Sequence, residues 1–126
     1  MRIPILKQGG YLIATVQSAV SDTDFLKLRE DLLGLVCTHR AQGVVIDVTA
    51  LDVLDSFASR SLKALAQMVK LRGADTVIVG IQPEVAFAMV QLGLTLPGIA
   101  TALDLEEGLL LLSARARERQ GRVHGT

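Results

Sequence analysis

The chain has 126 residues, half of them hydrophobic, and its 13 basic side chains balance 13 acidic ones. That length and composition suit a single domain with a real core and exclude wholesale disorder. The balanced charge argues against electrostatic binding of nucleic acid. The only aromatic residues are Tyr11 and three phenylalanines, which argues against binding by base stacking.

Cysteine usage and hydropathy indicate the cellular compartment in which we expect the protein. Cys37 is the only cysteine, which excludes an internal disulfide and a cysteine metal cluster and indicates a reducing environment. Residues 1–10 lack the apolar stretch of a signal peptide, and no apolar run approaches the ~20 residues needed to cross a bilayer. We therefore expect a cytoplasmic protein that binds neither membrane nor nucleic acid. High apolar content at zero net charge also favours self-association.

Apolar periodicity and turn residues predict alternating strands and helices along the chain. The expected elements, in chain order, are strands at 3–6 and 12–16, a helix at 22–39, a strand at 44–48, a helix at 56–72, a strand at 76–79, a helix at 83–92, a strand at 99–102 and a helix from 105.

Several elements carry their own start signals. Gly9-Gly10, between the first two strands, is typical of a hairpin turn. Asp22 or Asp24 can cap the first helix, Pro83 suits the first turn of the third helix, and Asp104 can cap the last.

The pattern as a whole predicts an α/β fold. The β-branched runs at 44–48 and 76–79 are typical of strands buried on both faces. Their alternation with amphipathic helices predicts a mostly parallel sheet of four or five strands, an N-terminal β-hairpin and four helices. We expect this domain to occupy residues 1–112. The charged extension at 113–126, which is rich in arginine, is expected to be a solvated helix end that frays from Arg115 onward.

The motifs that an enzyme would need are missing from the sequence. It has no Walker-type glycine loop and no GxGxxG, so nucleotide binding has no signature. His39 and His124 have neither a metal-ligand spacing nor a cysteine partner, and Cys37 is expected to be buried and inert in the first helix. We predict no enzymatic activity, no cofactor and no metal. Asp52 and Asp55 follow a strand, where carboxylates can line a site in an α/β fold. An enzyme or small-ligand carrier that uses a cleft beside them therefore stays an alternative function.

The start of the second helix offers a modification site. Ser56 follows Asp55 there, and an exposed hydroxyl at this place can gain a phosphate that adds about −1.5 to −2 charges. An Asp-Ser pair at a helix start can equally be no more than a helix cap. Ser59 and Ser61 are competing hydroxyls but fall inside the helix, and Thr49 ends its strand.

Several segments together resemble a known family, the STAS domains, which is the fold of anti-sigma-factor antagonists, and within it the RsbS-type stressosome scaffolds. The resemblance runs from about residue 3 to 112. Its marks are Pro4-Ile5-Leu6-Lys7, Gly43-Val44-Val45-Ile46-Asp47-Val48 leading to Asp55-Ser56-Phe57, Gly80-Ile81-Gln82-Pro83-Glu84-Val85-Ala86, Gln91-Leu92-Gly93 and Thr101-Ala102-Leu103-Asp104-Leu105-Glu106-Glu107-Gly108-Leu109.

The resemblance implies a non-enzymatic scaffold in a bacterial stress-signalling pathway. Such proteins assemble with RsbR-like STAS proteins into a large particle that sequesters an RsbT-like serine/threonine kinase. Phosphorylation, here of Ser56 with Ser59 as a secondary candidate, releases the kinase, and a phosphatase resets the site. We expect the kinase-binding surface to comprise Asp52, Asp55, Ser56, Phe57, Gln82, Pro83 and Glu84. The alternative is a stand-alone anti-sigma-factor antagonist, regulated by serine phosphorylation without large-particle assembly.

Overall fold

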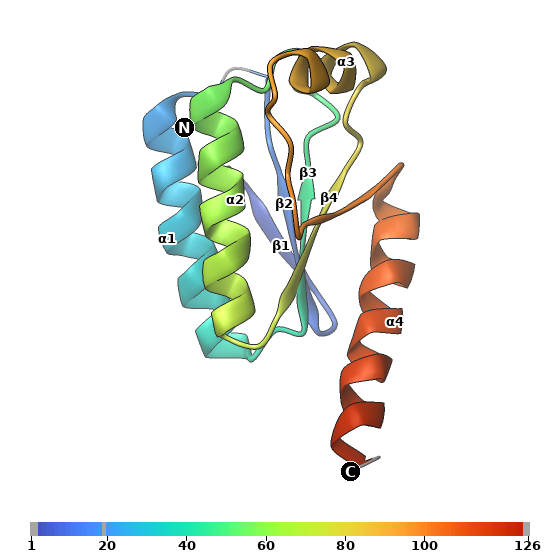
Figure 1. Ribbon diagram of the computed structural model, residues 1–126. Coiled ribbons are helices and arrows are strands. Elements are labelled where there is room, and N and C mark those ends of the chain that lie inside the picture. The colour runs from blue at the N-terminus through green and yellow to red at the C-terminus, as the bar shows by residue number, and fades with distance from the viewer. Residues whose placement is uncertain (1–2, 19, 125–126) are drawn as a thin grey trace.

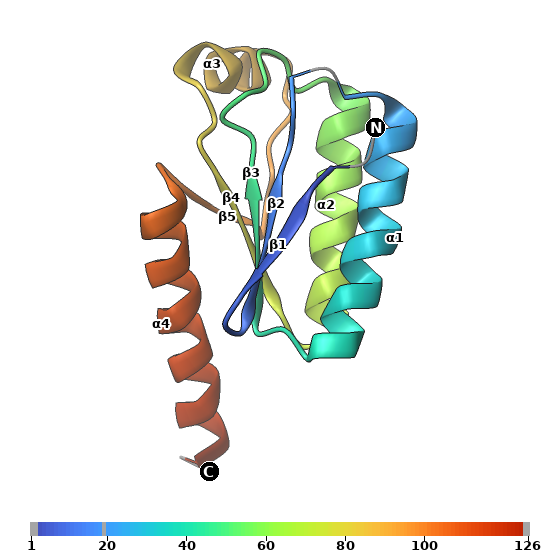
Figure 2. The ribbon, with the colours of Figure 1, turned by 180° about the vertical axis from the view of Figure 1, so that it is seen from behind.

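The computed structural model describes residues 3–18 and 20–124. Within these ranges the elements are β1 (Ile5–Gln8), β2 (Tyr11–Thr15), α1 (Asp22–His39), β3 (Gly43–Asp47), α2 (Ser56–Leu71), β4 (Asp75–Val79), α3 (Pro83–Gln91), β5 (Ala100–Ala102) and α4 (Leu105–His124). The strand order is β1-β2-β3-β4-β5; β1 is antiparallel to β2, and every other pair is parallel (Figures 1 and 2). The predicted α/β fold with an N-terminal hairpin is confirmed, although β1 begins two residues later than expected.

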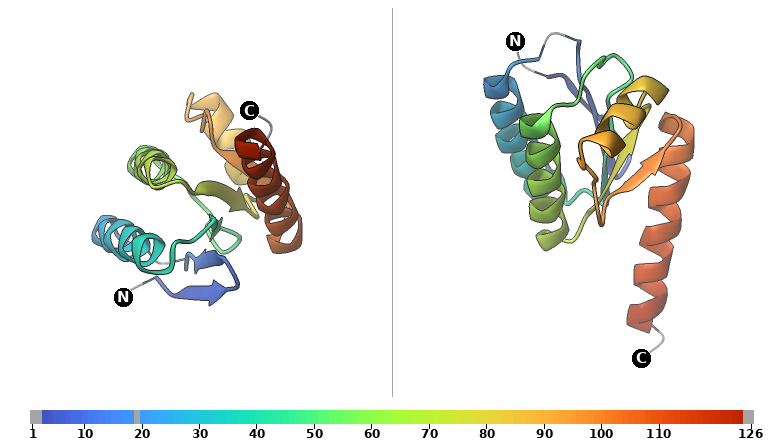
Figure 3. Two further views of the ribbon diagram at one scale, coloured as in Figure 1. Left: turned by 90° about the horizontal axis from the view of Figure 1, so that it is seen from below. Right: turned by 45° about the horizontal axis from the view of Figure 1, so that its top comes forward.

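Helices cover both faces of the sheet. Figures 1 and 2 show α1 and α2 on one face and α4 on the other, and the left view of Figure 3 shows the layers from below. The central strand β3 therefore buries successive side chains on opposite sides. Val44 and Ile46 belong to the cluster that contains the core residues of α1 and α2, whereas Val45 belongs to the cluster under α4. This double burial explains why β3 reads as a continuous apolar run.

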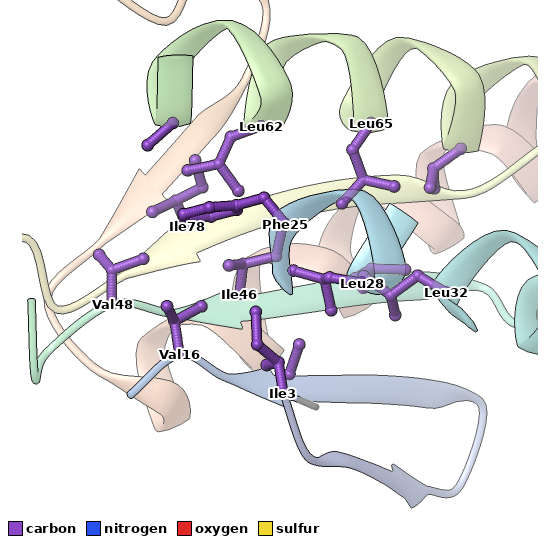
Figure 4. Packing of buried hydrophobic residues seen from close by; sticks show 14 of the residues in the cluster. Ile3, Val16, Phe25, Leu28, Leu32, Ile46, Val48, Leu62, Leu65 and Ile78 are labelled. Carbon is purple, nitrogen blue, oxygen red and sulfur yellow. The ribbon is translucent and has the colours of Figure 1, made fainter. Parts of the chain in front are cut away.

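The larger cluster forms the main core. Figure 4 shows Leu28 of α1 and Leu62 and Leu65 of α2 packed over Ile46 and Ile78 of the sheet. All five side chains are no more than 2% exposed. The helical spacing of apolar residues in the sequence thus identified the faces that pack on the sheet.

The sequence prediction for α1 was wrong in two respects. Ser21, rather than Asp22 or Asp24, is the N-cap: its hydroxyl accepts the N–H of Asp24, and the Asp24 carboxylate accepts the N–H of Ser21 at 3.0 Å. This hydrogen bond from the backbone holds the pKa of Asp24 below its ordinary value of 3.8. Near the other end of the helix, Val36 faces the core at 2% exposure, so the next residue, Cys37, is turned outward and is exposed.

Helix α4 is longer than the sequence indicated. Asp104 caps it as predicted, accepting the N–H of Glu107 at 2.9 Å, and Leu112 is buried against the sheet. The helix then continues to His124 instead of fraying from Arg115. The division of the chain at residue 112 stays a prediction, and the side chains of residues 122–126 lie outside the described part. Within that part, no helix is both long and apolar enough to span a membrane.

Three polar contacts hold the extended α4 on the domain. Arg119 bonds to the buried carboxylate of Asp75 at 2.5 Å and to the carbonyl oxygen of Gln42 at 3.2 Å. The hydroxyls of Tyr11 and Ser113 lie 3.0 Å apart, which links the N-terminal hairpin to the same helix. At least to Arg119, therefore, the charged extension is packed on the domain and is not a freely solvated end.

Candidate functional site

The loop between β3 and α2 ends at the predicted switch residue. Asp55 is the N-cap of α2, and its Oδ1 accepts the N–H of Ala58 at 2.8 Å. Ser56 is the first residue of the helix and is exposed. Its hydroxyl therefore lies at the positive end of the helix, where a kinase can reach it. The helix-cap interpretation is confirmed for Asp55, and the cap leaves the hydroxyl of Ser56 available.

Buried leucines fix the course of this loop. Leu51 and Leu54 are 5% and 4% exposed and belong to the main core. Asp52 and Val53, which lie between them, are exposed, and Val53 keeps 71% of its surface in contact with solvent. The loop thus presents acidic and apolar side chains from a backbone that is attached to the core on either side of them.

A second loop, after β4, is hydrogen-bonded to the first. The Oδ1 of Asp47 accepts both the N–H and the hydroxyl of Thr49, at 2.9 and 2.6 Å. The Nε2 of Gln82 donates to the carbonyl oxygen of Thr49 at 2.7 Å. Gly80, with φ of +80°, lies so close that an added Cβ would be 2.0 Å from the Thr49 Oγ1. The two loops are therefore joined by their contacts at Thr49.

The structure brings the two predicted segments to the same end of the sheet, as the right view of Figure 3 shows for the start of α2 and for α3. Both segments follow the carboxyl ends of neighbouring parallel strands. Their residues differ in exposure. The exposed ones are Asp52, Asp55, Ser56, Pro83 and Glu84, and the half-buried ones are Phe57 and Gln82.

Ser59 lies differently from Ser56. It is 2% exposed, and among the described residues its Oγ is buried without a hydrogen-bond partner. A kinase cannot reach this hydroxyl while α2 stays packed on the sheet. The burial therefore argues against Ser59 as a second phosphorylation site in the folded domain.

The surroundings of Ser56 include the exposed carboxylates of Asp52 and Asp55. Among the described residues, no group of three or more histidine, cysteine, aspartate and glutamate side chains is placed to hold a metal ion. Four cavities of roughly 320–510 Å³ occur in the described part of the chain, and neither Asp52 nor Asp55 lines any of these four. The alternative in which these two carboxylates flank a ligand cleft gains no support from these four cavities.

The bonds among Asp47, Thr49 and Gln82 were missed at the level of sequence. The Asp-x-Thr spacing is a signal for a side-chain turn and could have predicted the first of them. The hydrogen bond from Gln82 joins residues 33 positions apart, so local sequence patterns do not predict it.

Comparison with known proteins identifies the family. A family model described as the STAS domain matches residues 2–107. The chain belongs to the STAS family. Among its relatives is the RsbT co-antagonist protein RsbRA of Bacillus subtilis (strain 168), which is 36% identical over 89 residues covering 70% of this chain and 32% of that protein. The chain therefore spans about a third of the length of this relative.

Two solved structures are similar to the STAS chain over nearly its whole length. One is a serine-to-glutamate variant of RsbS from Moorella thermoacetica, with 37% identity, a TM-score of 0.80, and coverage of 93% of this chain and 99% of that one. The other is described as the molecular architecture of the stressosome, with 38% identity, a TM-score of 0.77, and coverage of 90% and 99%. The predicted resemblance to STAS domains and to RsbS is thus confirmed.

Proposed function

We propose that this STAS chain is a non-enzymatic scaffold subunit of a stressosome-type assembly, and that phosphorylation of Ser56 is its switch. Without phosphate, the scaffold sequesters an RsbT-like serine/threonine kinase on the surface formed by the loop after β3, the first turn of α2 and the residues from Gln82 to Glu84. The observation that carries the proposal is the exposed Ser56 on a firmly held acidic loop, in a chain similar to RsbS over nearly its whole length.

The physical basis of the switch is charge and not refolding. The dipole of α2 favours a phosphate at its first residue by about 0.3–1 kcal/mol, whereas the neighbouring carboxylates of Asp55 and Asp52 oppose it by roughly 1–4 kcal/mol at close range. Leu51 and Leu54 hold the loop in the core, so we expect the fold to tolerate this cost. The surface that the kinase contacts then becomes more negative by about 1.5–2 charges and repels it.

The proposed partners follow from the relatives. The similarity to RsbRA, whose name describes a co-antagonist of RsbT, supports co-assembly with RsbR-like STAS proteins and a kinase of the RsbT class. The similarity to a chain of a stressosome structure supports assembly into a large particle together with further copies of the chain. A phosphatase that acts on Ser56 completes the cycle.

Kinase retention tests the switch directly. In a pull-down with an RsbT-like kinase, Ser56→Asp should retain much less kinase than the wild type, and Ser56→Ala should keep it bound after ATP is added. Gln67→Glu is the matched control, because it adds one negative charge to an exposed position of the same helix three turns away. Equal retention by Ser56→Asp and Gln67→Glu, with both proteins folded, would contradict the proposal.

Assembly and modification need separate measurements. Light scattering of the chain mixed with an RsbR-like protein should show a particle in the megadalton range, whereas a stand-alone antagonist would give only small complexes. Mass spectrometry after incubation with the kinase and ATP should find phosphate on Ser56. Phosphate on Ser59 or Thr49 instead would move the switch to another residue.

A further inference from the structure

A cavity of about 380 Å³ lies along the second half of α2, away from Ser56. Its walls come from the later turns of α2, the start of β4, residues 97–99 and Arg115 of α4. The sheet leaves room for the cavity because β5 begins opposite Val77 of β4. The first two residues of β4 therefore have no partner among the described strands on that side. The volume falls within the range of roughly 300–1,000 Å³ that is usual for small-molecule sites.

The charge around this cavity is positive. Lys63, Lys70 and Arg115 line it, together with a single carboxylate, that of Asp75. Asp75 is already neutralised, because Lys70 bonds to it at 2.9 Å and Arg119 bonds to its other oxygen. In the described part of the chain, Lys63 and Arg115 have no carboxylate partner. An anionic group that enters the cavity therefore meets two cations that are free to bind it.

The wall of the cavity also contains an unsatisfied hydroxyl. Thr76 lines the cavity and is only 8% exposed, and among the described residues its Oγ1 is buried without a hydrogen-bond partner. A buried hydroxyl without a partner is costly, and a rotation of about 120° around χ1 would carry the oxygen to the place that the methyl group occupies. A ligand oxygen at the wall would give this hydroxyl a partner.

The remainder of the lining is largely apolar and includes Ala66, Leu71 and Ile99. We propose that the cavity binds a small amphipathic anion, which consists of an apolar ring or short chain with one phosphate or carboxylate group. Its anionic end lies between Lys63 and Arg115 and accepts a hydrogen bond from Thr76, and its apolar end contacts the aliphatic wall. The site is separate from the Ser56 surface and does not depend on the switch.

Titration of the isotope-labelled full-length chain, followed by NMR, tests the proposal. Phenyl phosphate and benzoate serve as probes, inorganic phosphate supplies the anion without the apolar body, and phenol supplies the body without the anion. We expect saturable shifts centred on the amides of Thr76, Gly98 and Ile99, with at least about tenfold higher affinity for a probe that has both parts. The stronger of the two probes shows whether phosphate or carboxylate is preferred.

Two hydroxyl deletions make a matched pair. Thr76→Val and Ser59→Ala each remove a buried hydroxyl that has no partner among the described residues, but only Thr76 lines the cavity. Each variant should keep its melting temperature or raise it by about 3–5 °C. Thr76→Val should weaken binding of the better probe about tenfold, as should Lys63→Met, while Ser59→Ala should bind like the wild type.

Three results would overturn the proposal. One is the absence of saturable shifts for every probe up to about 10 mM, which would mean that the cavity has no useful affinity. Another is a set of shifts spread evenly over all surface lysines and arginines. The third is equal affinity in Thr76→Val and Ser59→Ala. None of these measurements involves the kinase. If the proposed switch at Ser56 failed its own test, they would be unaffected, so the two proposals can fail independently.

Discussion

Replacement of Gly80 by alanine is expected to destabilise the protein more than the same replacement of Gly73. Both glycines have positive φ, +80° and +89°, so an alanine at either position is placed in the left-handed region. The space around them differs. A Cβ on Gly80 would lie 2.0 Å from the Oγ1 and 3.1 Å from the Cβ of Thr49, whereas a Cβ on Gly73 would meet nothing within 4 Å.

The magnitudes follow from these contacts. The left-handed conformation costs about 1–2 kcal/mol for a residue with a Cβ, and this is the whole expected loss for Gly73→Ala. At Gly80 the side chain of Thr49 must also move. Its two hydrogen bonds to Asp47 and the bond that Gln82 donates to its carbonyl oxygen are then at risk, at about 0.5–1.5 kcal/mol each. We therefore expect a loss of roughly 3–5 kcal/mol for Gly80→Ala.

Urea unfolding followed by circular dichroism measures both losses, provided that the m-values stay equal. The double variant Thr49→Ala/Gly80→Ala lacks the oxygen that clashes. Relative to Thr49→Ala alone, adding Gly80→Ala should therefore cost at least about 1 kcal/mol less than it costs in the wild type. Equal stabilities of Gly80→Ala and Gly73→Ala would refute the argument, because they would show that the two loops do not press against each other at Thr49.

Three further predictions concern other parts of the fold. Because Asp24 has a lowered pKa in the folded state, its ionised form adds stability that is complete above the ordinary pKa and is lost as the pH falls through the folded value. Asp24→Asn should therefore flatten the melting temperature between about pH 5 and pH 3. Arg119→Met should cost about 1–2 kcal/mol in urea unfolding, since it removes one of the two cations bonded to buried Asp75. Leu112→Ala, at 2% exposure, should cost about 2–4 kcal/mol, whereas Leu110→Ala, at 66% exposure, should change stability by less than about 0.5 kcal/mol when both are followed by thermal unfolding.

Much of the fold could be predicted because burial imposes a period on the sequence. In α2 the apolar residues Ala58, Leu62, Leu65 and Val69 recur at helical spacing, and all of them are buried. The same rule could have placed Ser59, which lies three residues before Leu62 on that stripe. The spacing of this hydroxyl indicates a side chain that faces the sheet, and not an accessible target for a kinase.

The prediction that Cys37 is buried was wrong because either of two neighbouring apolar residues of α1 could have faced the core. In α1 both Leu35 and Val36 are apolar, and Val36 is the more deeply buried. That choice turns Cys37, about 100° further around the helix, toward solvent. The length of α4 was underestimated for a different reason. Its later turns are polar, and they are held by contacts to Asp75 and Gln42 that lie 44 and 77 residues away in the sequence.

The position of Asp55 favours a charge switch at Ser56 over a folding switch. Its carboxylate is bonded to the N–H of Ala58 and caps α2, so the negative charge beside Ser56 is part of what begins the helix. A phosphate on Ser56 cannot displace that carboxylate without the loss of a cap contribution of about 1 kcal/mol. Leu51, Leu54 and the bond from Gln82 to Thr49 oppose any larger movement of the loop. In the proposed switch, the added charge would therefore stay on the surface, beside the carboxylates, where a bound partner would experience it directly.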